Sequence, residues 1–259
     1  MANKKTIEEI EIMREGGAIL SRALEAAAKA VRPGVKLEEL DRMATEVIRE
    51  AGGEPSFLHY KGHKEDTPFP SALCASVNDE IVHGPATRDI ELKEGDLIGL
   101  DLGCEYKGMF TDMAMTVPVG EISDEAKRLM KVTKDSLYAA IDVVKPGNMI
   151  ADIGAVVEKT VAPSGFGIVR SLVGHGVGHA VHEDPRIPNF IDPSLAKIKM
   201  VEGMCLAIEP MITAGDYQIM TLDDGWTCAT ADGSLSAHFE VTVVVTEDGY
   251  EILTPQPEL

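Results

Sequence analysis

The sequence is poor in basic residues and lacks long apolar runs. Its 24 Lys and Arg stand against 43 Asp and Glu, so the formal net charge is −19. Because proteins bind nucleic acid and anionic lipid through Lys and Arg, this balance argues against both as the main partner. No apolar run approaches the roughly 18 residues of a membrane span, and Glu8, Glu9 and Glu11 interrupt the stretch where a signal peptide would be continuous. We therefore expect a cytoplasmic protein outside the membrane.

Cysteine is also scarce. Cys74, Cys104, Cys205 and Cys228 contain no C-x-x-C pair, so they resemble neither a disulfide framework nor a zinc knuckle. We expect free thiols in a reducing compartment. The remaining composition, 44% apolar and 26% charged residues, is typical of globular proteins. A chain of 259 residues suits one large domain or two intimately joined halves.

Helical and strand patterns alternate along the chain. Thr6 and Glu9 have the spacing of a capping box, and apolar residues then recur with helical period until Pro33-Gly34. Further helices are predicted at 37–50, 124–144 and 150–161, and strands at 97–102, 204–208, 237–246 and 250–253. Residues 54–76 are broken by prolines and are predicted to be loop with short strands. The alternation indicates an α+β fold.

Two segments of the sequence resemble each other. Residues 94–101 and 202–209 each consist of a Glu-Gly turn, an apolar strand and a terminal carboxylate, Asp101 or Glu209. A fold duplicated about a pseudo-twofold axis would bring both strands and both carboxylates to its centre. The alternative is a chance likeness between two strands that follow glycine.

Asp101 and Asp112 flank a turn-like segment. A two-residue turn at Tyr106-Lys107 would place Asp101 directly opposite Asp112, with Cβ atoms roughly 4.5–5.5 Å apart. Like charges at that distance repel each other unless a cation lies between them, and an unpaired charge at the end of an apolar run is costly to bury. The pair therefore indicates metal ligation. The alternative is an edge hairpin with both carboxylates in solvent.

Three histidines lie in a glycine-rich segment. His175, His179 and His182 fall between Gly174 and Pro185, and the interspersed glycines favour a loop or bulged strand over a helix. A neutral imidazole can ligate a metal, shuttle a proton or donate a hydrogen bond. Because the three side chains cannot all face one way, we expect them to have different roles.

Two glutamates complete an oxygen-rich set. Glu209 precedes Pro210 at a strand end, and Glu240 interrupts the apolar run 237–245, where its side chain is paired, coordinated or turned outward. Two Asp, two Glu and one His suit a pair of divalent first-row ions rather than a cysteine-type zinc site. Two ions about 3.5–4 Å apart can hold a hydroxide and polarise a carbonyl, which is hydrolytic chemistry.

These motifs resemble type I methionine aminopeptidases of the M24 metallopeptidase family, and the resemblance covers nearly the whole chain. It is carried by Asn78-x4-His83-Gly84, Asp101-Leu102-Gly103, Thr111-Asp112, Gly174-His175-Gly176-Val177-Gly178, His182-Glu183-x-Pro185, Glu209-Pro210 and Ser234-Leu235-Ser236-Ala237-x-x-Glu240. It implies a pita-bread fold, in which duplicated helix pairs surround a curved antiparallel sheet. Residues 1–259 would form one catalytic domain of two pseudo-symmetric halves, about 1–120 and 121–259.

The resemblance also implies two divalent metal ions, which could be Co, Mn, Fe or Zn. Asp101 would bind one ion, and His175 and Glu209 the other. Asp112 and Glu240 would bridge them. A bridging hydroxide would attack the carbonyl after an N-terminal methionine, and Glu209 would handle the nucleophile's proton. As further catalytic residues, His83 and His182 would hold the substrate amide and stabilise the tetrahedral intermediate.

The resemblance places the methionine pocket at Tyr60, Cys74 and Trp226. The sequence departs from the family nearby, because the segment 61–70 is longer than usual and Val181 stands where Phe is common. The valine would either widen the pocket or leave a gap that the longer loop fills. His179 has no role in the family pattern, and we expect it behind the ligands or on the surface.

The expected protein is a cytoplasmic enzyme that removes N-terminal methionine from nascent proteins and peptides when the second residue is small. We expect a monomer that contacts the ribosome transiently and has no specific nucleic-acid or membrane partner. One alternative is an aminopeptidase of the same fold with another preference, such as Xaa-Pro peptides. Another is a non-catalytic pita-bread module that binds chain ends or partner proteins.

Overall fold

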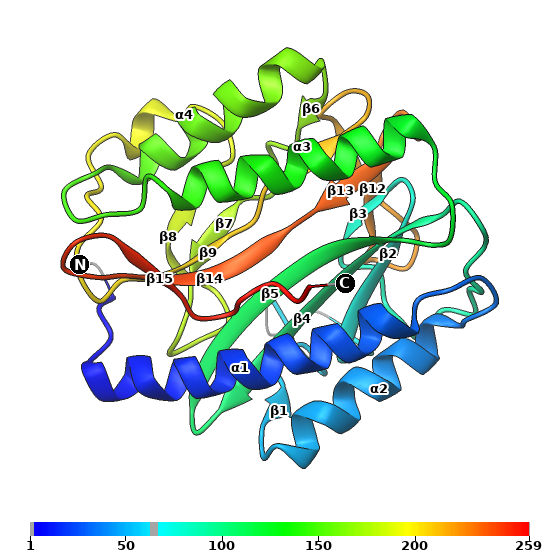
Figure 1. Ribbon diagram of the computed structural model, residues 1–259, viewed down its shortest axis with the longest axis horizontal. Coiled ribbons are helices and arrows are strands. Elements are labelled where there is room, and N and C mark those ends of the chain that lie inside the picture. The colour runs from blue at the N-terminus through cyan, green and yellow to red at the C-terminus, as the bar shows by residue number, and fades with distance from the viewer. Residues whose placement is uncertain (1–2, 63–66, 259) are drawn as a thin grey trace.

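The computed structural model describes residues 3–62 and 67–258. Two helix pairs flank a sheet (Figure 1): α1 (Ile7–Ala30) packs on α2 (Leu37–Glu50), and α3 (Asp124–Ile141) packs on α4 (Ile150–Val161). Helix α1 contacts strands β4 and β5, whereas α3 contacts β9, β10 and β13. The main core lies between these helices and the sheet. None of the helices in the described ranges is both long and apolar enough to cross a bilayer.

The large sheet is antiparallel and has nine strands, ordered β1-β4-β5-β14-β9-β7-β8, with β2 beside β4 and β15 beside β14. Two three-stranded sheets, β13-β10-β6 and β11-β12-β3, adjoin it. The strands are β1 (Glu54–Pro55), β2 (Leu73–Val77), β3 (Glu80–Val82), β4 (Leu97–Tyr106), β5 (Met109–Pro118), β6 (Gly167–Ile168), β7 (Gly174–Gly176), β8 (Glu183–Ile187), β9 (Cys205–Ile208), β10 (Met211–Thr213), β11 (Ile219–Thr221), β12 (Cys228–Thr230), β13 (Ser236–His238), β14 (Glu240–Val245) and β15 (Tyr250–Ile252). Short 3-10 turns lie at η1 (Ala162–Ser164) and η2 (Pro193–Leu195).

The predicted helices are present, and the capping box at Thr6 and Glu9 is confirmed by reciprocal hydrogen bonds. The expected strand 97–102 is longer than predicted, since β4 continues through Gly103 to Tyr106. A Cβ at Gly103 would lie 2.1 Å from Ser56 Oγ, so the neighbouring chain can pass this close only because the residue has no side chain. The glycine therefore does not end the strand. The expected strand 237–246 is divided at Phe239 into β13 and β14. All four cysteines are free, as expected, and all four are buried.

The predicted pairing of Asp101 with Asp112 is wrong by two residues. The β4–β5 turn is Lys107-Gly108, whose φ angles of 50° and 82° suit a tight two-residue hairpin turn. Asp101 therefore pairs with Ala114, and Asp112 pairs with Gly103. Moving the turn by one residue shifts the partner by two, so Asp101 and Asp112 still share one face as diagonal neighbours.

The two similar segments lie in one sheet. They form β4 and β9, which are separated by β5 and β14 (Figure 1). Each contributes a carboxylate near the middle of the sheet, Asp101 within β4 and Glu209 just after β9. This placement agrees with the expected pseudo-twofold arrangement. The division of the chain near residue 120 stays a prediction.

Helix α1 crosses the C-terminal segment at a glycine. A Cβ at Gly17 would lie 2.0 Å from the Leu253 carbonyl oxygen, so helix and segment can meet only without a side chain. Gly17→Ala is therefore expected to destabilise the protein by about 2 kcal/mol or more, as overpacking does, although alanine is normally the better helix former. Urea unfolding measures the change in the free energy of unfolding. Ala18→Gly at an exposed position of the same helix is the control, and it should lower that free energy by about 1 kcal/mol through helix propensity alone. A Gly17→Ala protein as stable as the parent would contradict this packing.

Candidate metal centre

Four carboxylates and one imidazole are directed to one face of the large sheet. Ala114 of β5 pairs with Asp101 on one side and with Glu240 on the other. Directly paired residues, and residues two apart on one strand, point to the same face. Asp112, two residues before Ala114, therefore shares the face of Asp101 and Glu240.

Strand β9 extends this face towards the histidine. Ala207 pairs with Thr242 of β14 and with His175 of β7. Because Thr242 lies two residues after Glu240, Ala207 and His175 are on the same face as that glutamate. Glu209 follows Ala207 by two residues, and its Oε1 lies 3.5 Å from His175 Nε2. Residues from both halves of the sheet thus meet at one point.

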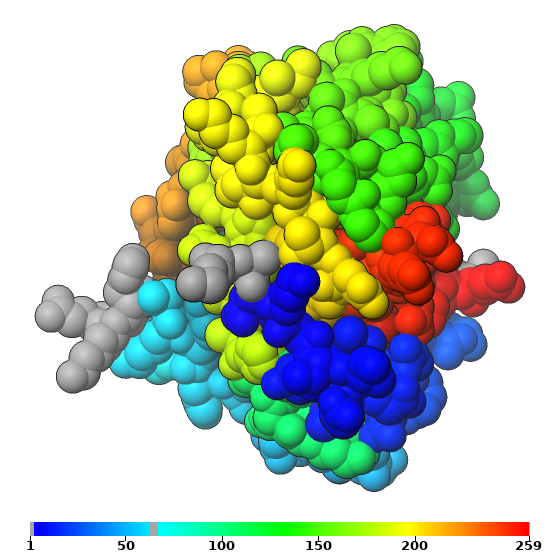
Figure 2. All heavy atoms as spheres, turned by 90° about the vertical axis from the view of Figure 1, so that its left-hand side faces the viewer, coloured from blue at the N-terminus to red at the C-terminus, as the bar shows by residue number. Residues whose placement is uncertain are grey.

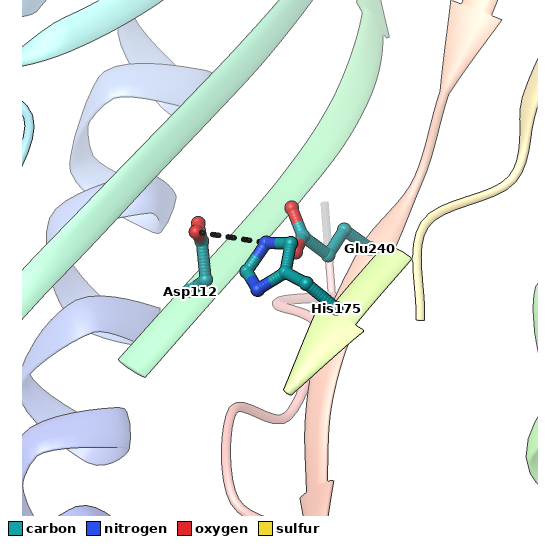
Figure 3. Close-up of side chains that lie close together, drawn as sticks. All are labelled: Asp112, His175 and Glu240. Carbon is teal, nitrogen blue, oxygen red and sulfur yellow. Dashed lines mark ion pairs between the residues drawn. The ribbon is translucent and has the colours of Figure 1, made fainter. Parts of the chain in front are cut away.

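Asp112, His175 and Glu240 offer ligand atoms that all lie within 4.8 Å of one another. Figure 3 shows the three side chains converging from β5, β7 and β14, and the dashed line joins Asp112 Oδ2 to His175 Nε2 at 3.9 Å. All three are buried. These distances between the three ligand atoms suit a shared cation, because the ligand atoms of one ion lie close together without hydrogen-bonding to each other.

Three of the carboxylates have an oxygen without a partner. Within the described part of the chain, Asp101 Oδ1, Asp112 Oδ1 and Glu240 Oε1 are buried without a hydrogen-bond partner. Burial raises the pKa of Asp101 to about 7, and burial with neighbouring carboxylates raises the pKa of Asp112, Glu209 and Glu240 well above normal. Buried unpartnered oxygens next to one neutral imidazole fit divalent metal ions.

All the residues predicted for the site line one cavity. They are Tyr60, Cys74, His83, Asp101, Asp112, His175, His182, Glu209, Trp226 and Glu240. Phe57, Phe69 and Val82 complete the wall. The cavity therefore has a carboxylate end next to an aromatic and apolar end. The individual roles given to these residues stay predictions.

At the apolar end of the cavity, the longer loop fills the space that Val181 leaves. This valine is clustered with Phe57, Phe69 and Cys74, and Phe69 packs edge-on against Trp226 with ring centroids 5.2 Å apart. Phe69 N–H donates to the Tyr60 carbonyl at 2.9 Å, which closes the base of the longer loop. Phe69 at the loop's end thus fills space beside the valine. Residues 63–66, including His63, lie outside the described residues.

Two further imidazoles border the site. The His182 ring lies edge-on to the His175 ring with centroids 4.5 Å apart, and its Nδ1 is 2.6 Å from the Tyr60 hydroxyl. Burial lowers the pKa of His182, and burial followed by the His182 charge lowers the pKa of His83 to about 4. Both imidazoles are therefore neutral at pH 7 and can donate hydrogen bonds without a formal charge.

Sequence reasoning missed His238. This buried side chain places Nε2 3.6 Å from Glu209 Oε2 and 3.9 Å from Glu240 Oε2, and that nitrogen has no hydrogen-bond partner among the described residues. Its position two residues before Glu240, on the same side of an extended chain, was the available signal. His179, in contrast, lies at the surface, where its Nε2 is 2.7 Å from Glu9 Oε1.

Comparisons with known proteins agree with this geometry. Residues 11–247 match metallopeptidase family M24. A methionine aminopeptidase of Clostridium perfringens is 45% identical over 96% of this chain and 97% of its own length. Methionine aminopeptidase 1 of Bacillus subtilis is 43% identical over 96% of this chain and 98% of its own length.

Solved structures share the architecture. The crystal structure of methionine aminopeptidase from Thermotoga maritima is 39% identical, with a TM-score of 0.93 over 99% of this chain and 100% of that one. A prolidase from Pyrococcus furiosus, 22% identical with a TM-score of 0.76 over 98% of this chain and 66% of its own, has the same fold. The predicted pita-bread fold is confirmed, and the chain belongs to metallopeptidase family M24.

Proposed function

We propose that this chain is a metallo-aminopeptidase that removes methionine from the N-terminus of peptides and nascent proteins, with a preference for a small second residue. The observation that carries the proposal is the single cavity in which a buried carboxylate cluster adjoins an aromatic pocket. The first end suits hydrolytic metal chemistry, and the second suits an unbranched apolar side chain. Relatives above 40% identity that bear the name methionine aminopeptidase support it.

We infer that the carboxylate end binds two divalent ions. Asp101 would ligate one ion, His175 and Glu209 would ligate the other, and Asp112 and Glu240 would contribute to both. The support is the common face of these residues and the unpartnered oxygens of Asp101, Asp112 and Glu240. Divalent ions bound there would polarise the scissile carbonyl and activate a water molecule. Their identity depends on metal availability, because this donor set accepts Co, Mn, Fe or Zn.

The chain's own groups would complete the reaction. Glu209 would accept a proton from the attacking water and return it to the leaving amine. His83 and His182 would donate hydrogen bonds to the scissile amide and to the oxygen that gains charge. Cys74 would contact the methionine side chain as a small apolar surface. Burial and Asp101 raise the pKa of its thiol well above normal, so it is not a nucleophile.

Tyr60 would determine which nitrogen of His182 carries the proton. Its hydroxyl oxygen lies 2.6 Å from Nδ1. A hydroxyl that donates to Nδ1 would leave the proton on Nε2, free to be donated to the substrate. Tyr60→Phe keeps the ring and removes this bond, so kcat is expected to fall up to about tenfold with little change in KM. Steady-state kinetics on a Met-Ala peptide measure the effect, with Phe69→Leu as a pocket control that should raise KM. Unchanged kcat in Tyr60→Phe would contradict the tautomer assignment.

The proposed activity is tested by mass spectrometry on metal-reconstituted protein with peptides that begin Met-Ala, Leu-Ala and Met-Pro. We expect loss of methionine from Met-Ala peptides and much slower loss of leucine, because the pocket is lined by groups that suit an unbranched side chain. Equal cleavage of Leu-Ala would keep the metal chemistry and reject the methionine preference. Cleavage confined to Met-Pro would favour the Xaa-Pro alternative, and no cleavage by folded protein would favour the binding module.

We further propose that the enzyme acts as a monomer in the cytoplasm and meets nascent chains through a local, transient ribosome contact. The net charge of −19 opposes extended contact with RNA and so supports a small contact area. We also propose that residues 1–259 form one catalytic domain of two related halves. The arrangement of β4 and β9 about the β5–β14 pair supports this division.

A further inference from the structure

Glu183 belongs to the motif His182-Glu183-x-Pro185, but the chemistry above does not use it. Its Oε2 lies 2.6 Å from Lys5 Nζ, and the two side chains are only 7% and 0% exposed. Its other oxygen accepts hydrogen bonds from the backbone N–H groups of His179 and Ala180. A single buried carboxylate thus joins the N-terminal segment before α1 to the loop 177–183.

The loop is shaped around the lysine. Gly178 has φ of 140°, and a Cβ there would lie 2.2 Å from Lys5 Cε. The Gly178 carbonyl also accepts a hydrogen bond from Phe110 N–H of β5 at 2.8 Å. Figure 2 shows the blue N-terminal segment beside yellow-green chain, the colour of residues near 180. The lysine side chain therefore occupies space that only glycine leaves open.

A second contact on the same loop serves as a comparison. His179 Nε2 lies 2.7 Å from Glu9 Oε1, but these side chains are 41% and 30% exposed. Solvent-exposed pairs contribute little, whereas removing one partner of a buried pair leaves an uncompensated charge. The two contacts join the same loop to the same end of the chain, and they differ mainly in burial.

We propose that Lys5 and Glu183 are positioning residues for His182. The buried pair holds the loop 177–183 from the backbone side, while Tyr60 holds the imidazole from the cavity side. His182 is bonded directly to Glu183, so a shift of the loop displaces its ring relative to the metal ligands. Small displacements of a positioned catalytic group can cost about 10²-fold in rate. This inference rests on the proposed function, in which His182 contacts the substrate.

The test compares Lys5→Met, Lys5→Arg, the double variant Lys5→Met/Glu183→Gln and the exposed control His179→Gln. We expect Lys5→Met to lower kcat on a Met-Ala peptide about tenfold or more, with KM changed less than threefold. Lys5→Arg should recover part of the loss, and His179→Gln should stay within twofold. Mn²⁺ affinity, measured by calorimetry, should be unchanged in all four.

If Lys5→Met does not fold, the double variant decides the question, because it leaves no lone buried charge. Its kcat should fall at least fivefold.

A double-mutant cycle distinguishes an effect of the Lys5–Glu183 pair on His182 from a general effect of the pair on the structure. In a His182→Ala background, Lys5→Met should lower the residual kcat no further, because the pair acts through that ring. An equal further loss would overturn the proposal, as would an unchanged kcat in the folded variant or a loss of Mn²⁺ affinity. The ¹⁵N shifts of the His182 ring in metal-free protein, assigned with His182→Gln, should change in Lys5→Met. That readout holds even if the unmodified chain fails to cleave methionine, so the two proposals fail separately.

Discussion

Asp112→Asn is expected to lower kcat/KM by about 10³-fold or more, which corresponds to about 4 kcal/mol, and yet to stabilise the metal-free protein. Asp112 is one of the two carboxylates proposed to contact both ions, and an amide replaces one anionic donor with a neutral, weaker one. The backbone bond from Asp112 N–H to Thr242 Oγ1 is retained. The loss of activity therefore reports on the metal centre rather than on the strand.

The opposite effect on stability follows from burial. Burial raises the pKa of Asp112, and the neighbouring Asp101 and Glu209 raise it further. An ionised carboxylate at this place is therefore unfavourable at pH 8 when no cation is bound, and the neutral amide removes that cost.

Urea unfolding in the presence of a chelator measures this effect, and a divalent ion added afterwards should stabilise the parent much more than Asp112→Asn. Asp89→Asn is the control, because that side chain is 86% exposed and should change stability little. A destabilised metal-free Asp112→Asn protein, or one with near-normal activity, would reject the assignment.

Removal of divalent ions is expected to abolish activity and to lower stability in a pH-dependent way. A ligand present at 100 times its Kd stabilises the folded state by about 2.7 kcal/mol, and a chelator removes this contribution. Thermal unfolding with and without Mn²⁺ measures the difference. Activity should return when Mn²⁺ is restored, which distinguishes metal loss from irreversible unfolding.

The sign of the pH effect follows from two groups of residues. Burial raises the pKa of Asp101 from 3.8 to about 7, so the folded state holds its proton more tightly than the unfolded state. The resulting stability is present below pH 4 and is lost as the pH rises through 7, a change of about 4 kcal/mol. Burial lowers the pKa of His175 and His238 to about 3. The contribution of these two histidines to the stability of the folded state is present above pH 6.5 and is lost as the pH falls towards 3.

The two contributions oppose each other between pH 4 and 6.5. Above pH 6.5 the histidine contribution rises only slightly further. The pKa values of Asp112, Glu209 and Glu240 are also raised by burial, and these carboxylates add to the effect of Asp101, so the stability of the metal-free protein should fall from pH 6.5 to 8. Bound ions should remove most of this slope, because they compensate the carboxylate charges. Urea unfolding at pH 6.5, 7 and 8 tests the expectation. A metal-free stability that rises over this range would contradict the raised carboxylate pKa values.

The local patterns in the sequence determined much of the fold. The capping box at Thr6, the glycine and proline stops and the apolar periods gave all four helices within a few residues, because these signals depend on neighbours along the chain. The likeness between 94–101 and 202–209 predicted two strands of one sheet, each with a carboxylate. Side-chain alternation then placed Asp101 and Asp112 on one face even though the turn was predicted one residue too early.

Only the tertiary structure decided which distant side chains meet. His238 approaches Glu209, Phe69 fills the space beside Val181, and Lys5 reaches Glu183 across most of the chain. None of these three pairings follows from periodicity, because each depends on how separate elements pack against one another. The one local signal was the place of His238 two residues before Glu240, and it does not reveal Glu209 as a neighbour. The sequence thus identified the motif residues as one set of metal-ligating and substrate-binding candidates. The supports that hold them in place were decided by three-dimensional packing, where burial and charge act between residues that the chain keeps far apart.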